Sequence, residues 1–307
     1  MTDCMDVFYP LYLRKKAIRE RMDKTMQNHQ ARIRLSNNVG IPCLGFGTWK
    51  TPAEQAAASV LHALEAGYRH IDTATAYNNE AAVGTAIASS GIPREEIFLT
   101  SKLWNPHQGY QPTLDAFERS LERLQTAYLD LYLIHWPHDR KYFDNWQEMN
   151  RETWRAFEKL YKDGRIKAIC VSNFRPHHLE NLLDGCEIAP MVDQVEVHPG
   201  MPQDEILAFC KEHQIVVEGW SPLATGKIFS VPTMQEMAQK YGKTVAQLCL
   251  RWCIQRSVIP LPKSVTLSRI VENTQIFDFQ LEQDDVDRIS GLTECGWSGL
   301  DPNNLIY

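Results

Sequence analysis

Ile97-Phe98-Leu99-Thr100-Ser101-Lys102 is one of three short apolar runs that each lead to a side chain able to carry a proton. The run before it ends at Asp72 and is followed by Tyr77, and the run after it ends at His135. The runs are about thirty residues apart, which is the length of one strand-plus-helix unit. If the strands are parallel neighbours, these four side chains meet at one end of a sheet, where a catalytic centre is expected.

The alternation of strand and helix continues along the rest of the chain. Eight strands are expected, at 44–48, 70–73, 97–102, 130–135, 168–172, 191–197, 216–220 and 258–261. Helical periodicity is found at 53–66, 113–126, 154–160, 202–210 and 245–252, and a surface loop is expected at 139–151. Such units with short connections predict an α/β fold of the (β/α)8 TIM barrel type. A doubly wound open sheet is disfavoured, because Lys50 stands where a dinucleotide-binding fingerprint needs its third glycine.

A β-hairpin is expected before the first barrel strand. The segments 32–35 and 41–45 flank a turn containing asparagine and glycine, and we expect this hairpin to close the bottom of the barrel. Residues 31–307 are predicted to form a single domain. Residues 1–30 are interpreted as an N-terminal extension, helical or disordered. Its apolar stretch precedes its basic stretch, the reverse of a signal peptide, so no export signal is expected.

Composition narrows the class of protein. The chain has 307 residues, of which 44% are hydrophobic and 23% charged, with a net charge of -6. These values are ordinary for a globular protein and argue against a nucleic-acid surface, which needs a basic patch. No apolar run approaches the length of a membrane span. The eight cysteines form no CxxC pair, and Cys249 and Cys253 share an apolar helical face, so reduced thiols in a cytoplasmic protein are expected.

The four proton-active residues suggest a reduction. A phenol has a pKa of about 10, and a nearby ammonium makes it a stronger acid by favouring the phenolate. Lys102 is the candidate ammonium for Tyr77, Asp72 can hold that lysine, and His135 can hydrogen-bond a substrate oxygen. The residues also have structural interpretations, since a buried Asp–Lys pair is often only an ion pair. A proton donor with no nucleophile beside it fits carbonyl reduction, with hydride from a cofactor.

Several motifs in this order resemble those of the aldo-keto reductase family, from about Arg32 to the C-terminus. They are His70-Ile71-Asp72-Thr73-Ala74 with Tyr77, Asn79 and Glu80; Thr100-Ser101-Lys102-Leu103-Trp104; Leu133-Ile134-His135-Trp136-Pro137; Val171-Ser172-Asn173-Phe174; Gln194-Val195-Glu196 with His198-Pro199; Trp220-Ser221-Pro222-Leu223; and Pro262-Lys263-Ser264. Among subgroups, the chain looks most like bacterial glyoxal, methylglyoxal and 2,5-diketo-gluconate reductases.

The resemblance implies NADPH-dependent reduction of aldehydes or ketones to alcohols. The substrates would be 2-oxoaldehydes such as methylglyoxal, or keto-sugars. Tyr77 would be the proton donor, assisted by Lys102 and Asp72, and His135 would orient the carbonyl. Trp49 and Trp104 would wall the substrate pocket together with Tyr77 and His135.

The resemblance also implies that NADPH lies extended across the strand ends. The expected cofactor residues are Gly47, Thr48 and Asp72 near the nicotinamide ribose, Ser172, Asn173 and Gln194 at the carboxamide, Trp220 against the ring, Ser221 and Leu223 along the pyrophosphate, and Lys263, Ser264, Val265, Thr266, Arg269, Glu272 and Asn273 around the adenosine. Lys263 and Arg269 are two cations near a hydroxyl-rich turn at a helix start, which suits a 2'-phosphate and favours NADPH over NADH.

Two other classes of function are weighed against the reductase. A binding protein on the same barrel would use NADPH as a sensed ligand, although the complete set of four residues argues against it. A metal-dependent hydrolase would need a ligand cluster at the strand ends. The nearest approach is His135 with His138, and the intervening Trp-Pro indicates a turn, so no metal is expected. The expected partner is a small carbonyl substrate, and neither nucleic acid nor membrane. A monomer is expected.

Overall fold

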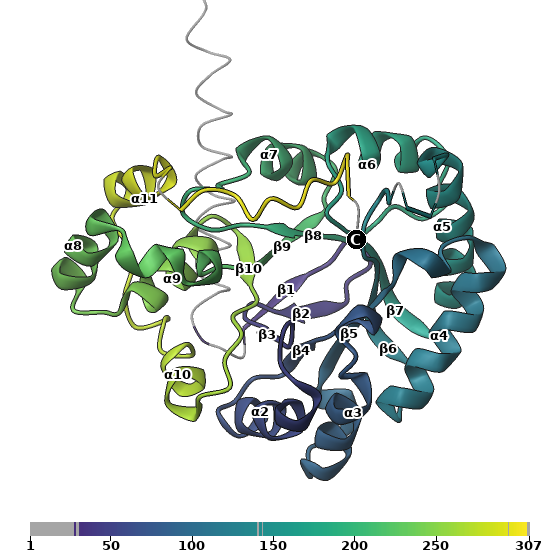
Figure 1. Ribbon diagram of the computed structural model, residues 1–307, viewed down its shortest axis with the longest axis horizontal. Helices are drawn as coiled ribbons and strands as arrows, with labels where there is room; N and C mark the ends of the chain where they lie inside the picture. The colour runs from purple at the N-terminus through teal and green to yellow at the C-terminus, as the bar shows by residue number, and fades with distance from the viewer. Residues whose placement is uncertain (1–27, 29–30, 140, 143, 294, 306–307) are drawn as a thin grey trace, which may run out of the picture.

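Eight parallel strands follow one another around the centre of the molecule in chain order, β3 to β10 (Figure 1). The computed structural model describes residues 28, 31–139, 141–142, 144–293 and 295–305. The strands are β3 (Phe46–Gly47), β4 (His70–Asp72), β5 (Phe98–Leu103), β6 (Leu129–Ile134), β7 (Ile166–Ser172), β8 (Val192–Glu196), β9 (Val216–Trp220) and β10 (Val258–Pro260).

Backbone hydrogen bonds join the first strand to the last. Gly45 N donates to Pro260 O at 3.1 Å, and Gly47 N donates to Pro262 O at 3.0 Å. A Cβ on Gly45 would lie 2.8 Å from His70 Nδ1, so only glycine allows the chain to approach this closely. The sheet therefore closes on itself, and the predicted (β/α)8 barrel is confirmed.

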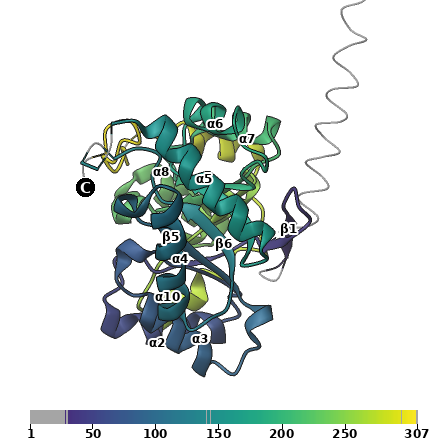
Figure 2. The same ribbon diagram turned by 90° about the vertical axis from the view of Figure 1, so that its right-hand side faces the viewer.

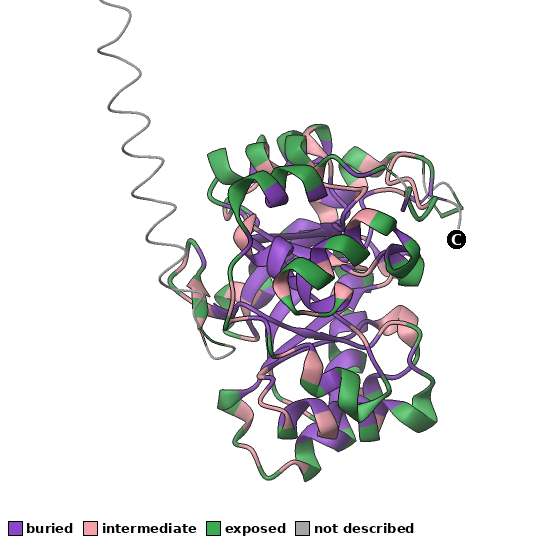
Figure 3. Ribbon diagram, turned by 90° about the vertical axis from the view of Figure 1, so that its left-hand side faces the viewer, coloured by how far each residue is buried: buried purple, intermediate pink, exposed green. Residues whose placement is uncertain are grey.

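Helices surround the barrel, and most of them bury one face, whereas α9 is buried on nearly all sides. They are α2 (Ala53–Glu65), α3 (Glu80–Ser89), α4 (Tyr110–Leu124), α5 (Trp146–Lys162), α6 (Pro176–Leu183), α7 (Asp204–Glu212), α8 (Pro232–Tyr241), α9 (Val245–Gln255), α10 (Leu267–Glu272) and α11 (Gln283–Ser290). In α4 the sequence predicts one apolar stripe of Leu114, Phe117, Leu121 and Leu124. The last three are buried and Leu114 is half-buried. Figure 3 shows the same division in general, with buried strands inside and exposed outer helix faces.

The loop expected at 139–151 is shorter in the structure. Helix α5 begins at Trp146, so the second half of that segment is helical. Glu148 lies on the exposed face of this amphipathic helix, where a charged side chain is compatible with helix formation. The expectation of a loop over the whole segment was therefore wrong.

The N-terminal hairpin lies at one end of the barrel. Its strands β1 (Arg32–Arg34) and β2 (Gly40–Pro42) pair antiparallel, and the turn residue Asn37 donates from Nδ2 to Lys167 O at 2.8 Å, near the start of β7. Figure 2 shows β1 at the right-hand end, away from the C-terminal segment. The hairpin therefore covers the amino ends of the strands, as predicted.

Two further expectations concern the chain as a whole. The predicted extension 1–30 lies outside the described residues apart from Asn28, so its character and the division into domains stay predictions. Among the helices of the described part, none has the length and apolarity needed to cross a bilayer.

Candidate functional site

The four proton-active residues lie together at the carboxyl ends of the barrel strands. Asp72 is the last residue of β4, Lys102 lies near the end of β5, and His135 follows β6 directly. Tyr77 is in the short 3-10 helix η1 (Thr75–Tyr77) that follows β4. Because parallel strands bring their carboxyl ends to one face, the barrel brings these side chains together.

Lys102 connects the carboxylate to the phenol. Its ammonium lies 2.7 Å from each carboxylate oxygen of Asp72, 3.0 Å from the carbonyl oxygen of Thr73 and 3.4 Å from the hydroxyl of Tyr77. The lysine side chain is fully buried and Asp72 is nearly so. A buried charge needs such partners, and the carboxylate holds the ammonium in place beside the phenol.

His135 packs edge-on against Tyr77, with ring centroids 5.7 Å apart. The Trp104 ring lies 5.4 Å from the same imidazole. Burial, and then the positive charge of Lys102, hold the pKa of His135 well below its usual range. The imidazole is therefore neutral at physiological pH and can donate one N–H without adding a charge.

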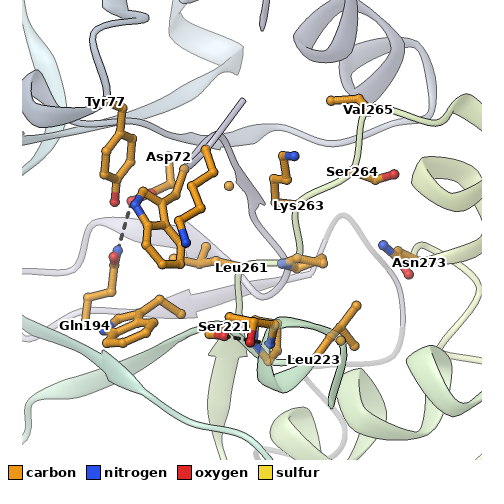
Figure 4. Close-up of a pocket in the computed structure, with 18 of the residues that line it drawn as sticks. Asp72, Tyr77, Gln194, Ser221, Leu223, Leu261, Lys263, Ser264, Val265 and Asn273 are labelled. Carbon is orange, nitrogen blue, oxygen red and sulfur yellow. Dashed lines mark hydrogen bonds between the residues drawn. The ribbon is translucent and has the colours of Figure 1, made fainter. Parts of the chain in front are cut away.

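A cavity of about 1020 Å³ opens beside these residues and extends across the barrel face. Figure 4 shows Tyr77, Asp72 and Gln194 at one end and Ser264, Val265 and Asn273 at the other. Most of the predicted cofactor residues line it, namely Gly47, Asp72, Ser172, Asn173, Gln194, Trp220, Ser221, Leu223, Lys263, Ser264, Val265, Thr266, Arg269, Glu272 and Asn273. A long cavity with a catalytic set at one end is the shape that an extended dinucleotide needs.

Amide groups and an indole are held rigidly at the near end of this cavity. Trp220 donates from Nε1 to Asn173 Oδ1 at 2.8 Å, and Asn173 donates from Nδ2 to His135 O at 2.9 Å. Ser172 donates from Oγ to Gln194 O at 2.8 Å. The aromatic face and the polar groups beside it suit a flat heteroaromatic ring that carries an amide.

The far end of the cavity carries positive charge. Lys263 and Arg269 both line it, and among the described residues neither forms an ion pair. Burial lowers the pKa of Lys263 from its usual value. Ser264 Oγ accepts from Thr266 N at 3.0 Å, and this bond fixes the turn before α10. Two unpaired cations suit a phosphate, so the residues present fit NADPH.

Two of the predicted residues act from behind the cavity. Thr48 is buried and does not line it; its hydroxyl donates to Asp72 O at 2.9 Å. Trp104 does not line the cavity and packs edge-on against His135, which does. Trp49 lines the cavity and packs edge-on against Trp220, with ring centroids 6.2 Å apart.

Sequence reasoning missed several residues of this region. Lys50, Phe229 and Leu300 line the cavity, and Glu218 lies buried beneath it. A glutamate inside the apolar strand Val216-Val217-Glu218-Gly219-Trp220 was an available signal, because a charged residue is rarely fully buried without a partner. Leu300 had no such signal, since it reaches the cavity from a loop far along the chain.

The described residues do not support a redox pair or a metal site. Cys249 and Cys253 are free and buried, as expected for small core residues. Among the described residues no group of three or more His, Cys, Asp or Glu is arranged to hold a metal ion.

Comparison with known proteins gives a consistent result. The model of the Aldo/keto reductase family matches residues 43–294. The chain is 50% identical over 276 residues to the glyoxal reductase of Bacillus subtilis (strain 168), covering 90% of this chain and 97% of the relative. It is 42% identical over 275 residues to the methylglyoxal reductase DkgA of Salmonella typhimurium, covering 89% and 97%.

Solved structures of aldo-keto reductases have the same fold as this chain. The aldo-keto reductase MGS-M4 from a deep-sea metagenome library superimposes with a TM-score of 0.85 at 43% identity, covering 90% of this chain and all of that chain. A Gox0644 mutant solved in complex with NADPH gives a TM-score of 0.84 at 39% identity, covering 91% and 99%. The chain is therefore a member of the aldo/keto reductase family, an oxidoreductase that uses NADPH to interconvert carbonyl and alcohol groups.

Proposed function

We propose that this enzyme reduces 2-oxoaldehydes such as glyoxal and methylglyoxal, with Tyr77 as the proton donor. Relatives named glyoxal reductase and methylglyoxal reductase, at 50% and 42% identity, support the substrate class. The observation that carries the catalytic assignment is the position of the Lys102 ammonium between the carboxylate of Asp72 and the hydroxyl of Tyr77.

Tyr77 supplies the proton to the carbonyl oxygen of the substrate. A phenol is a weak acid at neutral pH, and a fixed ammonium beside it favours the phenolate that remains after transfer. The Lys102 ammonium has this position, and its bonds to Asp72 hold it beside the phenol. The pair stabilises negative charge that develops only during the reaction, which is how such groups lower a barrier.

His135 positions the carbonyl. As a neutral donor on the cavity wall it holds the substrate oxygen near the phenol and leaves the proton transfer to Tyr77. Trp49, Tyr77 and His135 form the wall of the substrate pocket, and Trp104 supports His135 from behind. When bound, NADPH supplies the hydride.

The remaining cavity residues hold the cofactor in this proposal. Trp220 stacks on the nicotinamide, and Ser172, Asn173 and Gln194 meet its carboxamide. Gly47, Thr48 and Asp72 shape the ribose site, and Ser221 with Leu223 lies along the pyrophosphate. The adenosine end is formed by Lys263, Ser264, Val265, Thr266, Arg269, Glu272 and Asn273.

A substrate panel tests the substrate class. We expect the purified enzyme to oxidise NADPH with glyoxal and methylglyoxal, and with a lower kcat/KM for keto-sugars. A clear preference for keto-sugars would move the assignment to the diketo-gluconate type. No NADPH oxidation with any of these carbonyls would contradict the reductase function.

We further propose that the enzyme works as a monomer in the cytoplasm on small molecules, without nucleic acid or membrane. The net charge of -6 disfavours binding to phosphate backbones. The free cysteines of the described residues, most of them buried, suit a reducing compartment. Light scattering after gel filtration tests the monomer; a mass of twice the chain would contradict it.

A further inference from the structure

A second carboxyl group lies beneath the proposed catalytic residues. Glu218, on β9, has a fully buried side chain, and its Oε2 accepts from Gln194 Nε2 at 2.9 Å. The same Gln194 nitrogen donates to Asp72 Oδ2 at 2.9 Å. One amide group therefore bridges two buried carboxyl groups.

This bridge continues to the proposed proton donor. Asp72 binds Lys102 at 2.7 Å, and Lys102 lies 3.4 Å from the hydroxyl of Tyr77. Both carboxyl groups accept from the side-chain Nε2 of Gln194. Its side-chain oxygen Oε1 is therefore left to face the cavity that Gln194 lines. Figure 4 shows Gln194 bonded to Asp72 directly below Tyr77.

The other oxygen of Glu218 has no hydrogen bond to any described residue. It lies 3.5 Å from His70 Nε2, and that nitrogen is 3.0 Å from Thr100 Oγ1. An ionised carboxylate would leave this oxygen charged and unsatisfied in the barrel interior. A neutral acid group has an O–H that it can direct toward the imidazole.

The groups around Glu218 favour the neutral acid. The ionisable side chains that face it are His70 and Asp72 on β4, Lys102 on β5 and Cys170 on β7. Burial, and then the negative charge of Asp72, raise the pKa of Glu218 to about 8. Burial lowers the pKa of His70 to about 3, so this imidazole is neutral and cannot act as a counter-ion.

We propose that Glu218 is a positioning residue of this reductase that works as a neutral acid: it holds Gln194, and it leaves Asp72 as the single ionised carboxylate that Lys102 balances. This inference rests on the proposed role of Tyr77. When Glu218 loses its proton, a second negative charge enters the network. That charge opposes the negative charge that develops as Tyr77 gives up its proton, so reduction slows.

The pH dependence of kcat for carbonyl reduction tests this role. Glu218→Gln keeps the size and neutrality of the acid but cannot ionise. We expect the wild-type kcat to fall as Glu218 ionises, and the alkaline midpoint in Glu218→Gln to move up by about one pH unit or more.

Asp193→Asn is the matched control. Asp193 is a fully buried carboxyl on β8 next to Gln194, and it accepts a hydrogen bond from the backbone of Phe174. Successive strand residues face opposite sides, so it lies outside the network. Its pH profile should follow the wild type. An unchanged alkaline midpoint in Glu218→Gln, or the same shift in Asp193→Asn, would overturn the inference.

Infrared spectroscopy measures the protonation state of Glu218 independently of enzyme activity. The difference between wild type and Glu218→Gln at neutral pH should contain the C=O band of a protonated carboxyl group, and this band should disappear as the pH rises past 8. A carboxylate band at neutral pH would overturn the inference even in an active enzyme.

If the protonated band is present but the wild type reduces no carbonyl, the proposed function fails and the inference about the Glu218 proton does not. A melting curve for each variant identifies misfolding. Burial also raises the pKa of Asp193, so the band is assigned to Glu218 from the difference spectrum. If Glu218→Gln misfolds, the Asp193→Asn enzyme, which lacks this second acid, is used for the band titration.

Discussion

The ammonium of Lys102 is equidistant from the two carboxylate oxygens of Asp72, at 2.7 Å from each, and both side chains are buried. Removing the lysine alone leaves a buried carboxylate without its counter-ion. We expect Lys102→Met to lower the free energy of unfolding by about 3–5 kcal/mol and to remove reductase activity. Urea unfolding and NADPH oxidation measure the two effects.

The double variant separates stability from catalysis. Asp72→Asn with Lys102→Met removes both charges, so most of the lost stability should return while activity stays absent. Equal destabilisation of the single and double variants would contradict the interpretation of this contact as a charge pair. Recovery of activity in the double variant would contradict its role in proton transfer.

The two cations at the far end of the cavity should select the phosphorylated cofactor. Lys263→Met and Arg269→Met remove charges that lie unpaired among the described residues. We expect each to weaken NADPH binding by about ten-fold, because a charged hydrogen bond is worth about 1.5–3 kcal/mol, and to change NADH binding little. Fluorescence titration with both cofactors measures the ratio of the Kd for NADH to the Kd for NADPH.

Lys227→Met is the control for this pair. Lys227 is an exposed lysine in the 3-10 segment η4 (Ala224–Ser230), and it does not line the cavity. Its loss should leave the affinities for NADPH and NADH unchanged. A similar loss in all three variants would indicate a general effect of net charge.

Leu300 should limit the size of the substrate. It lines the cavity from the C-terminal loop, which is held by Ser298 bonds to the buried carboxylate of Glu196, with Ser298 Oγ 2.7 Å from Oε2. Leu300→Ala enlarges this wall, so KM for an aromatic aldehyde should fall relative to KM for methylglyoxal. An unchanged ratio of the two KM values in Leu300→Ala would contradict a role of Leu300 in the substrate pocket.

The buried acid of Glu218 also affects stability. Its pKa is about 8 in the folded state and about 4.3 when unfolded. Between these values the folded state holds a proton that the unfolded state has lost. Wild-type stability should therefore decrease as the pH rises toward 8, by about 1.4 kcal/mol per pH unit relative to Glu218→Gln. Urea unfolding at several pH values checks this; a constant difference would contradict it.

The barrel and the place of the four proton-active residues could be predicted because both follow from local sequence. Each apolar run specifies a strand, and the regular spacing places the polar residue that follows it at the same face. Asp72, Lys102 and His135 occupy equivalent strand ends for this reason. The cofactor residues came from the resemblance of motifs, and their roles stay predictions.

Other parts depended on contacts between distant segments. The start of α5 at Trp146 was missed because the charged face of the helix resembles a solvated loop. The sequence marks Glu218 as a charged residue inside an apolar strand but does not show that it meets Gln194. Leu300 has no such mark, because it reaches the cavity only through the folding of the C-terminal loop. Spacing along the chain says little about either contact.

The central claim is that Tyr77 gives the proton. Tyr77→Phe keeps the ring and its packing against His135 and removes only the hydroxyl. The decisive measurement is NADPH oxidation with methylglyoxal by this variant, together with its affinity for NADPH. We predict affinity close to wild type and a loss of kcat of about 10²–10⁴-fold. Turnover near that of the wild type would contradict the account.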